Sequence, residues 1–301
     1  MPVGLIYLVW LTYMGGTDAW SLFRDGWFMT LTMVAGSFVA GASSEGGGAI
    51  AYPVMTLVFD IEPDVARNFS LAIQSIGMTA AALWIFAKRI PVETTYLWLA
   101  ALGGTVGIAV GTFYIAPLVP PAYAKMMFVT FWLSYGLALF TINHIRQRDA
   151  FEQLPALSTV EKLELVGVGM IGGVLSGILG NGLDICSFAF VTLKYRLSEK
   201  VATPTSVVLM AFNAIVGFML HGLVLQDMQP EALNYWLVSI PVVVLGAPFG
   251  AHVVSKIRRI YIAGALYVIF IVQFVSALLI IRPAGVLVLF SIGVFTFGLM
   301  L

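Results

Sequence analysis

Two polar, glycine-rich stretches interrupt a chain that is otherwise almost continuously apolar. Residues 41–48 read GASSEGGG and carry Glu45, and residues 177–184 read GILGNGLD and carry Asn181 and Asp184. Glycine permits positive φ angles and lets backbone N–H groups approach a solute, while a nearby carboxyl or amide can hydrogen-bond that solute or exchange a proton with it. We therefore place the candidate chemistry here and call 41–48 the first tip and 177–184 the second tip.

The composition of the chain indicates a membrane protein. Of its 301 residues, 60% are hydrophobic and only 10% are charged, and the mean hydropathy is +0.98, which leaves too little polar surface for a water-soluble globule. The zero net charge gives no sign of a nucleic-acid partner. The single cysteine, Cys186, excludes an intramolecular disulfide, and the N-terminus lacks the charge and cleavage pattern of a signal peptide. We predict an all-α integral membrane protein in the lipid bilayer.

The apolar runs predict two sets of five helical segments. The first set covers 27–43, 48–59, 65–87, 95–118 and 123–142; the second covers 163–179, 183–193, 201–224, 232–254 and 260–281, and 284–301 follows. Residues 3–14 are shorter than the roughly 20 residues that a span needs, so they form either a short tilted helix or an interfacial one. The resulting divisions are an N-terminal segment (1–26), a first repeat (27–142), a linker (143–162), a second repeat (163–281) and a C-terminal segment (282–301).

The two sets of segments resemble each other in sequence. They align without gaps from Gly36 with Gly172 to Ser70 with Ser206, an offset of 136 positions (172 minus 36). Further along, the pairs Gly107-xxx-Gly111 and Gly246-xxx-Gly250 correspond, and such pairs let membrane helices approach closely. Because each set holds an odd number of segments, the second copy enters the membrane from the opposite side. The pattern is typical of inverted repeats.

The positive charges indicate which side of the membrane is cytoplasmic, because cytoplasmic loops are enriched in Lys and Arg. One predicted side receives Lys88, Arg89, Arg146, Arg148, Lys162, Lys194, Arg196, Lys200, Lys256, Arg258 and Arg259, and the other receives Arg24, Arg67, Lys125 and Arg282. This excess of eleven over four places the linker in the cytoplasm.

The second segment of each set is too short to cross the membrane comfortably. A dozen helical residues reach about 18 Å, against a hydrocarbon core about 30 Å thick. Segments 48–59 and 183–193 therefore either cross the membrane or complete re-entrant hairpins whose tips meet near the midplane. The distribution of Lys and Arg between the two sides is the same in both cases, so it does not distinguish them. Irregular backbone at that depth requires surrounding protein or a water-filled cavity.

Each central polar residue of the tips has two interpretations. An acid at the bilayer centre costs roughly 2.5–3.5 kcal/mol on insertion scales, so Glu45 either couples a proton to solute movement or is a structural acid bonded to tip N–H groups. Asn181 either hydrogen-bonds a solute or serves as a turn residue. Asp184 either caps the following helix or joins the site. Two helices that begin at the tips favour an anion there, whereas the helices that end there oppose it.

Further candidate site residues lie within the tips or in the segments after them. They are Ser43, Ser44, Gly46, Gly47, Gly48, Arg67, Asn68, Ser70, Gln74, Gly182, Thr203, Thr205, Ser206 and Asn213. Arg67 could hold an anion with two hydrogen bonds, but its acidic neighbours favour a solvated salt bridge. Gln74 and Asn213 either face a cavity or bond to a neighbouring helix. No metal-ligand spacing occurs, and we expect neither a metal nor a cofactor.

The sequence EGGGAIAYP at 45–53, its partial repeat NGLDICSFA at 181–189 and the short loops resemble the TauE/SafE family of sulfite exporters, also called the toluenesulfonate uptake permease group. The resemblance covers about 27–281, although the second copy lacks the triple glycine and the proline. It implies a secondary transporter that moves sulfite, an organosulfonate such as sulfoacetate, or a related small sulfur-containing anion across a bacterial inner membrane by alternating access.

The direction of such transport, its coupling ion and the oligomeric state stay open at this stage. With the cytoplasm negative, expulsion of one negative charge gains about 2.3 kcal/mol per 100 mV, so efflux needs no coupling ion whereas uptake does. A passive anion channel is the alternative. An intramembrane hydrolase is disfavoured, because Ser43 and Ser44 lie near Glu45 without a Gly-x-Ser-x-Gly elbow.

Overall fold

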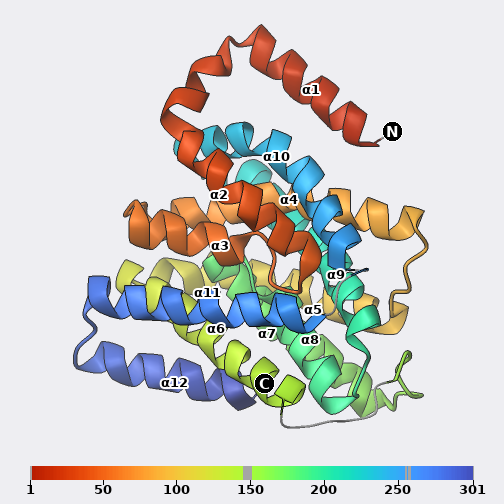
Figure 1. Cartoon of the computed structure of the whole chain (residues 1–301). Coiled ribbons are helices and arrows are strands. Elements are labelled where there is room, and N and C mark those ends of the chain that lie inside the picture. Colours follow the sequence, from red (N-terminus) through yellow and green to blue (C-terminus); the bar gives the residue numbers. More distant parts are fainter. Residues whose placement is uncertain (1, 145–150, 255, 257–258, 301) are drawn as a thin grey trace.

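The computed structural model describes residues 2–144, 151–254, 256 and 259–300, and these residues are predominantly helical (Figure 1). The elements of the first half are α1 (Pro2–Gly16), η1 (Ala19–Ser21), α2 (Leu22–Ala42), α3 (Gly48–Pro53), η2 (Val54–Val58), α4 (Pro63–Ala87), α5 (Thr94–Val110), η3 (Gly111–Ile115), η4 (Ala116–Leu118) and α6 (Pro121–His144). Those of the second half are α7 (Thr159–Leu179), α8 (Leu183–Lys194), α9 (Glu199–Met219), η5 (Leu220–Val224), α10 (Pro230–Val254), α11 (Arg259–Ile281) and α12 (Val286–Met300).

The described helices confirm an all-α integral membrane protein. Seven of them are long and apolar enough to cross a bilayer, namely Pro63–Ala87, Thr94–Leu118, Pro121–Thr141, Thr159–Leu179, Glu199–Val224, Pro230–Val253 and Gly264–Ile281. Shorter apolar helices cover Val3–Gly16, Gly48–Val58 and Val286–Met300. Among the described residues, the β pairing amounts to an isolated bridge between Phe151 and Leu197.

The segment boundaries agree with the sequence prediction within a few residues, with the largest difference at the start of the first segment. That segment was expected from residue 27, but α2 begins at Leu22. The additional turn includes Arg24 and Asp25, because a helix can continue beyond its apolar part into polar surroundings. The apolar N-terminal run forms α1, which is fixed to α10 by a 2.8 Å hydrogen bond from Trp10 Nε1 to Leu237 O.

The two halves of the chain are packed into each other rather than side by side. Helix α5 of the first half packs against α7 of the second, α10 of the second half packs against α2 of the first, and α4 packs against α9. Figure 1 places α1 at one edge, near α10, and α12 at the opposite edge, beside α6. This exchange of partners is the packing that a two-fold relation would produce; the inverted orientation of the repeats stays a prediction.

Glycines make the closest of these contacts. A Cβ added at Gly107 of α5 would lie 2.1 Å from Met170 O of α7, and one at Gly250 of α10 would lie 2.1 Å from Phe38 O of α2. Side chains larger than hydrogen would therefore push the helix backbones apart. The close approach expected for both glycine pairs is confirmed.

Hydrogen bonds at the helix ends are consistent with the predicted sidedness. Asn68, near the start of α4, donates a 2.8 Å hydrogen bond to Gln229 in the loop between α9 and α10. Thr205, near the start of α9, accepts a 2.9 Å hydrogen bond from the backbone N–H of Glu93 in the loop between α4 and α5. Each pair was predicted to share one side of the membrane. Of the residues in the charge count, Arg146, Arg148 and Arg258 lie outside the described residues.

Candidate functional site

The two tips touch each other. Asn181 Nδ2 of the second tip donates a hydrogen bond to the backbone oxygen of Glu45 in the first tip. Gln74 of α4 lies beside both, because its Nε2 donates to Gly180 O at 3.0 Å and a Cβ added at Gly46 would lie 2.3 Å from its Oε1. The predicted contact between the tips is therefore present, and its depth in the bilayer stays a prediction.

The first tip is a sharp turn between a long helix and a short one. Helix α2 ends at Ala42, Ser43 is extended (φ −144°, ψ 175°), and Ser43 Oγ accepts a 3.2 Å hydrogen bond from the backbone N–H of Glu45. Gly46 has a φ of +69°, a conformation that favours glycine, and α3 begins at Gly48. Helix α3 packs back against α2, so this part of the chain is a hairpin.

The second tip reverses the chain with two positive-φ glycines. Gly180 (φ +76°) ends α7 in the left-handed conformation, and Gly182 (φ +142°) precedes α8. The hydroxyl oxygen of Ser176 accepts a 3.1 Å hydrogen bond from the backbone N–H of Leu183, which closes the turn. Helix α8 packs back against α7, so both short segments complete hairpins.

The Glu45 carboxyl group lies in the interior without a hydrogen-bonding partner. Its side chain is fully buried, and neither carboxyl oxygen has a partner among the described residues. The Trp132 indole and the Tyr135 hydroxyl of α6 are close enough to interact with this carboxyl group, as is Asp184 of the second tip. Tyr135 also shares a 3.0 Å hydrogen bond with Ser44 Oγ. Glu45 is therefore held among aromatic side chains, not in bulk water.

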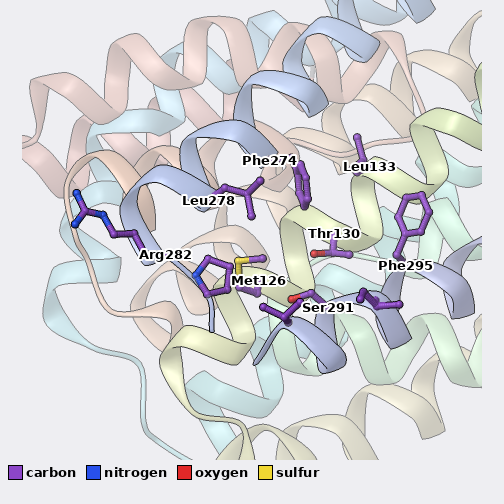
Figure 2. Close-up of a pocket in the computed structure, with 11 residues that line it drawn as sticks. Met126, Thr130, Leu133, Phe274, Leu278, Arg282, Ser291 and Phe295 are labelled. Carbon is purple, nitrogen blue, oxygen red and sulfur yellow. The ribbon is translucent and has the colours of Figure 1, made fainter. Parts of the chain in front are cut away.

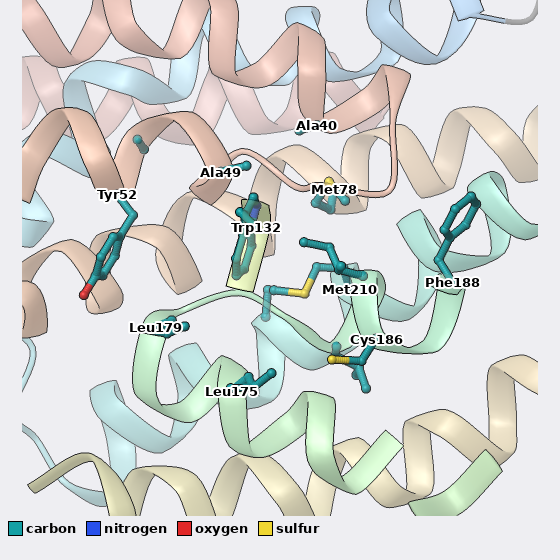
Figure 3. Close-up of a cluster of buried hydrophobic side chains, with 14 of the residues drawn as sticks. Ala40, Ala49, Tyr52, Met78, Trp132, Leu175, Leu179, Cys186, Phe188 and Met210 are labelled. Atoms are coloured by element: carbon teal, nitrogen blue, oxygen red, sulfur yellow. The ribbon is translucent and has the colours of Figure 1, made fainter. Parts of the chain in front are cut away.

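Apolar and aromatic side chains enclose the tips. The rings of Tyr52 and Phe128 stack at a centroid distance of 4.5 Å, and those of Phe128 and Trp132 stack at 4.2 Å. Figure 3 shows Tyr52 and Trp132 within the buried cluster, together with Leu179 at the end of α7 and Met210 of α9. Such surroundings lower the local dielectric constant, which makes each unpaired polar group more costly.

Polar atoms without partners are concentrated around the tips. Among the described residues, buried atoms of this kind include Glu45 Oε1 and Oε2, Ser70 Oγ, Gln74 Oε1, Trp132 Nε1, Asp184 Oδ2, and Asn213 Nδ2 and Oδ1. Leaving one such group unsatisfied costs about 1–3 kcal/mol. The set contains both donors and acceptors, so a small polar solute could satisfy several of them at once.

Asp184 and Asn181 have structural bonds that Glu45 lacks. Asp184 Oδ1 accepts a 3.0 Å hydrogen bond from the backbone N–H of Ile185 in the first turn of α8. The N-cap residue of α8 is Gly182, so Asp184 lies inside the helix end and does not cap it. Asn181 Oδ1 accepts a 3.0 Å hydrogen bond from the backbone N–H of Gly182 within the turn. Both residues thus hold the second tip in shape.

The expectation for Arg67 was wrong. Its side chain is only 9% exposed, and among the described residues it makes no ion pair within 4 Å. Its Nε donates a 3.0 Å hydrogen bond to Asn68 Oδ1, and the second tip packs against its backbone, because a Cβ at Gly180 would lie 2.5 Å from Arg67 O. The loop acid Asp60 pairs instead with Lys125 at 2.9 Å, and this hydrogen bond lowers the pKa of Asp60.

The hydroxyl candidates at the start of α9 do not reach the tips through hydrogen bonds of the described residues. Thr205 Oγ1 donates to Val201 O at 2.6 Å, and Ser206 Oγ donates to Thr203 O at 2.8 Å. These bonds stay within the first turns of α9. The hydroxyl groups of Thr205 and Ser206 therefore stabilise the helix, whereas Ser70 and Gln74 lie against the second tip. A role for Thr203, Thr205 and Ser206 at the site stays a prediction.

Three neighbours of the tips were missed in the sequence, namely Trp132, Tyr135 and Gln273. Gln273 Nε2 donates a 2.9 Å hydrogen bond to Ala49 O at the start of α3. Gln273 could have been identified from the sequence, because a glutamine in the middle of the very apolar α11 is unusual. Trp132 lies in the middle of α6 rather than at its end, where interfacial tryptophans gather.

Two hairpins whose tips meet inside a multi-pass helical protein are typical of secondary transporters. A family model described as "Sulfite exporter TauE/SafE" matches residues 28–278, and the chain belongs to this family. It is therefore a membrane transporter. No curated protein and no solved structure matches the chain.

Proposed function

We propose that this transporter moves sulfite, an organosulfonate such as sulfoacetate, or a related small sulfur-containing anion across the bacterial inner membrane by alternating access around the two tips. The observation that carries the proposal is the contact between the tips, surrounded by buried polar atoms without partners. The linker lies in the cytoplasm, as the charge count predicts.

The donors around the tips suit an oxyanion. The Ser70 hydroxyl, the Trp132 indole N–H and the Asn213 amide are buried and without partners among the described residues, so each can donate to a sulfite or sulfonate oxygen. The N-terminus of α8, a helix of 12 residues, adds a positive potential. Arg67 is the buried cation of the described chain and attracts the anion toward the second tip from the outer side.

Glu45 couples a proton to the anion in this proposal. An ionised carboxylate without a hydrogen bond is costly in the interior, and beside an anion it is also repulsive. A protonated Glu45 removes the repulsion and gains an O–H donor for the substrate. Proton and anion then move together, which makes uptake of a monoanion insensitive to the opposing membrane potential.

The test is flux of labelled sulfite and sulfoacetate into proteoliposomes that hold wild type, Glu45→Gln or Glu62→Gln. Glu62 is exposed in the loop before α4 and controls for the same chemical change outside the site. Wild type and Glu62→Gln should respond to an imposed pH gradient, and Glu45→Gln should lose that response while sulfite or sulfoacetate still raises its melting temperature.

Two other outcomes would contradict parts of the proposal. If all three proteins respond only to an imposed potential, Glu45 is a structural acid and the coupling is wrong. If flux rises linearly with anion concentration without saturation, the chain is a passive anion channel and alternating access is wrong.

A further inference from the structure

A cavity of about 610 Å³ lies between α6, α11 and α12, outside the tips (Figure 2). Helices α11 and α12 both pack against α6. Most of the cavity lining is apolar and includes Leu133, Phe274, Leu278 and Phe295. Its volume is in the range of about 300–1,000 Å³ that ligand pockets occupy. In a membrane protein, such a cavity is accessible to lipid hydrocarbon.

The cavity has one cationic end and one apolar end. Figure 2 shows Arg282 at one end and Leu133 and Phe295 toward the other. The lining from Met126 to Leu133 follows eight residues of α6, or about 10 Å along the helix axis. Arg282 follows α11 in the loop that the charge count places outside, so the cationic end is at the predicted outer surface and the apolar end lies deeper.

Among the described residues, Arg282 makes no ion pair with an acidic side chain within 4 Å. Its Nε donates a long, 3.4 Å hydrogen bond to Leu279 O. Two hydroxyl groups lie between the ends of the cavity. Thr130 is 2% exposed and its Oγ1 has no partner in the described chain, while Ser291 Oγ donates to Leu287 O at 2.8 Å.

We propose that this cavity binds one anionic phospholipid of the outer leaflet. An acyl chain occupies the apolar part between Phe274 and Phe295, the Thr130 hydroxyl donates to an ester oxygen, and Arg282 holds the phosphate. The order cation, hydroxyl, hydrocarbon along the cavity matches the order phosphate, ester, acyl chain in a phospholipid. A basic residue at the rim of an apolar pocket between membrane helices is suited to a lipid headgroup.

The bound lipid would support the first tip through α11. Phe274 lines the cavity, and the residue before it, Gln273, holds Ala49 at the start of α3. Lipid packed against Phe274 restrains this stretch of α11. Occupancy of the cavity therefore stabilises the hairpin that carries Glu45, and this effect does not depend on which anion is transported.

The test is native mass spectrometry of the full chain, purified in a neutral detergent and titrated with phosphatidylglycerol or phosphatidylcholine. Wild type should bind one phosphatidylglycerol more tightly than phosphatidylcholine, and Arg282→Gln should weaken phosphatidylglycerol binding about tenfold. Arg24→Gln, an exposed arginine on the same predicted side, is the matched control and should bind as wild type does. Thr130→Val tests the hydroxyl and should weaken both lipids alike.

Photo-crosslinking locates the acyl chain independently of affinity. A phosphatidylglycerol with a diazirine at the end of an acyl chain should label peptides that contain Leu133 or Phe295. Labelling elsewhere, or equal phosphatidylglycerol binding by wild type and Arg282→Gln, would overturn the proposal. A dimer of the delipidated protein with its crosslinks in α12 would show that a second copy of the chain, not a lipid, covers the cavity.

Discussion

The first tip and the second tip occupy equivalent places in the two halves, yet they differ in how their polar groups are used. Both oxygens of the Glu45 carboxyl group lack hydrogen bonds from the described residues. Asn181, at the aligned position, donates a hydrogen bond from Nδ2 to Glu45 O, and its Oδ1 accepts one from the backbone N–H of Gly182. The Asn181 amide thus stabilises the contact between the tips, whereas the Glu45 carboxyl group makes no hydrogen bond in it.

This difference shows why a repeat need not produce a symmetrical site. Two glycine-rich turns lie against each other, and glycine supplies the positive φ angles in both. A protonatable group is needed only once if one proton accompanies one substrate. An amide at the aligned position adds no further negative charge beside Glu45, to which Asp184 already lies close.

The largest expected effect comes from a comparison of Gly180→Ala with Gly46→Ala. Both glycines have positive φ, which costs about 1–3 kcal/mol for another residue. A Cβ at Gly180 would also lie 2.5 Å from the backbone oxygen of Arg67, whereas one at Gly46 meets the side chain of Gln74, which can move. Overpacking of that kind adds about 1–3 kcal/mol, so Gly180→Ala should lose more thermal stability.

Gly47→Ala is the matched control for this pair. Gly47 has a φ of −68°, and its nearest obstacle is the flexible end of Met33 at 3.2 Å. The melting temperature of Gly47→Ala in detergent should stay close to that of wild type. Equal losses in Gly180→Ala and Gly46→Ala would mean that both tips brace the fold alike, and the contrast between them would not hold.

Much of the fold could be predicted because membrane helices follow hydropathy and length. The contact between Glu45 and Asn181 followed from the aligned repeat and the short segments after each tip. Trp132 and Gln273 were missed because the packing of α6 and α11 against the tips is tertiary and has no motif. Arg67 was misjudged because its short distance from a loop suggested contact with water, whereas tertiary packing buries it.

A smaller difference in stability is expected between Asn181→Ala and Glu45→Gln, with the larger loss in Asn181→Ala. Asn181→Ala removes the donor to Glu45 O and leaves a buried carbonyl unpaired, which costs about 1–3 kcal/mol of stability. Glu45→Gln removes no hydrogen bond of the described structure, so its stability should change by less than about 1 kcal/mol. Thermal unfolding in one detergent, with Glu62→Gln as the control, measures both. A larger loss of stability in Glu45→Gln than in Asn181→Ala would mean that the Glu45 side chain, not Asn181, stabilises the contact between the tips.

Asp184→Asn should change stability less than Asn181→Ala or Glu45→Gln does. Asparagine keeps a side-chain oxygen that accepts from the N–H of Ile185, so stability should change by less than about 0.5 kcal/mol. The pH-gradient response of transport should also persist, because Glu45 carries the proton in the proposed mechanism. Proteoliposome flux under the same gradient measures this. If Asp184→Asn abolishes the response as Glu45→Gln does, the two acids act as a pair across the contact, and the second tip is as chemically active as the first.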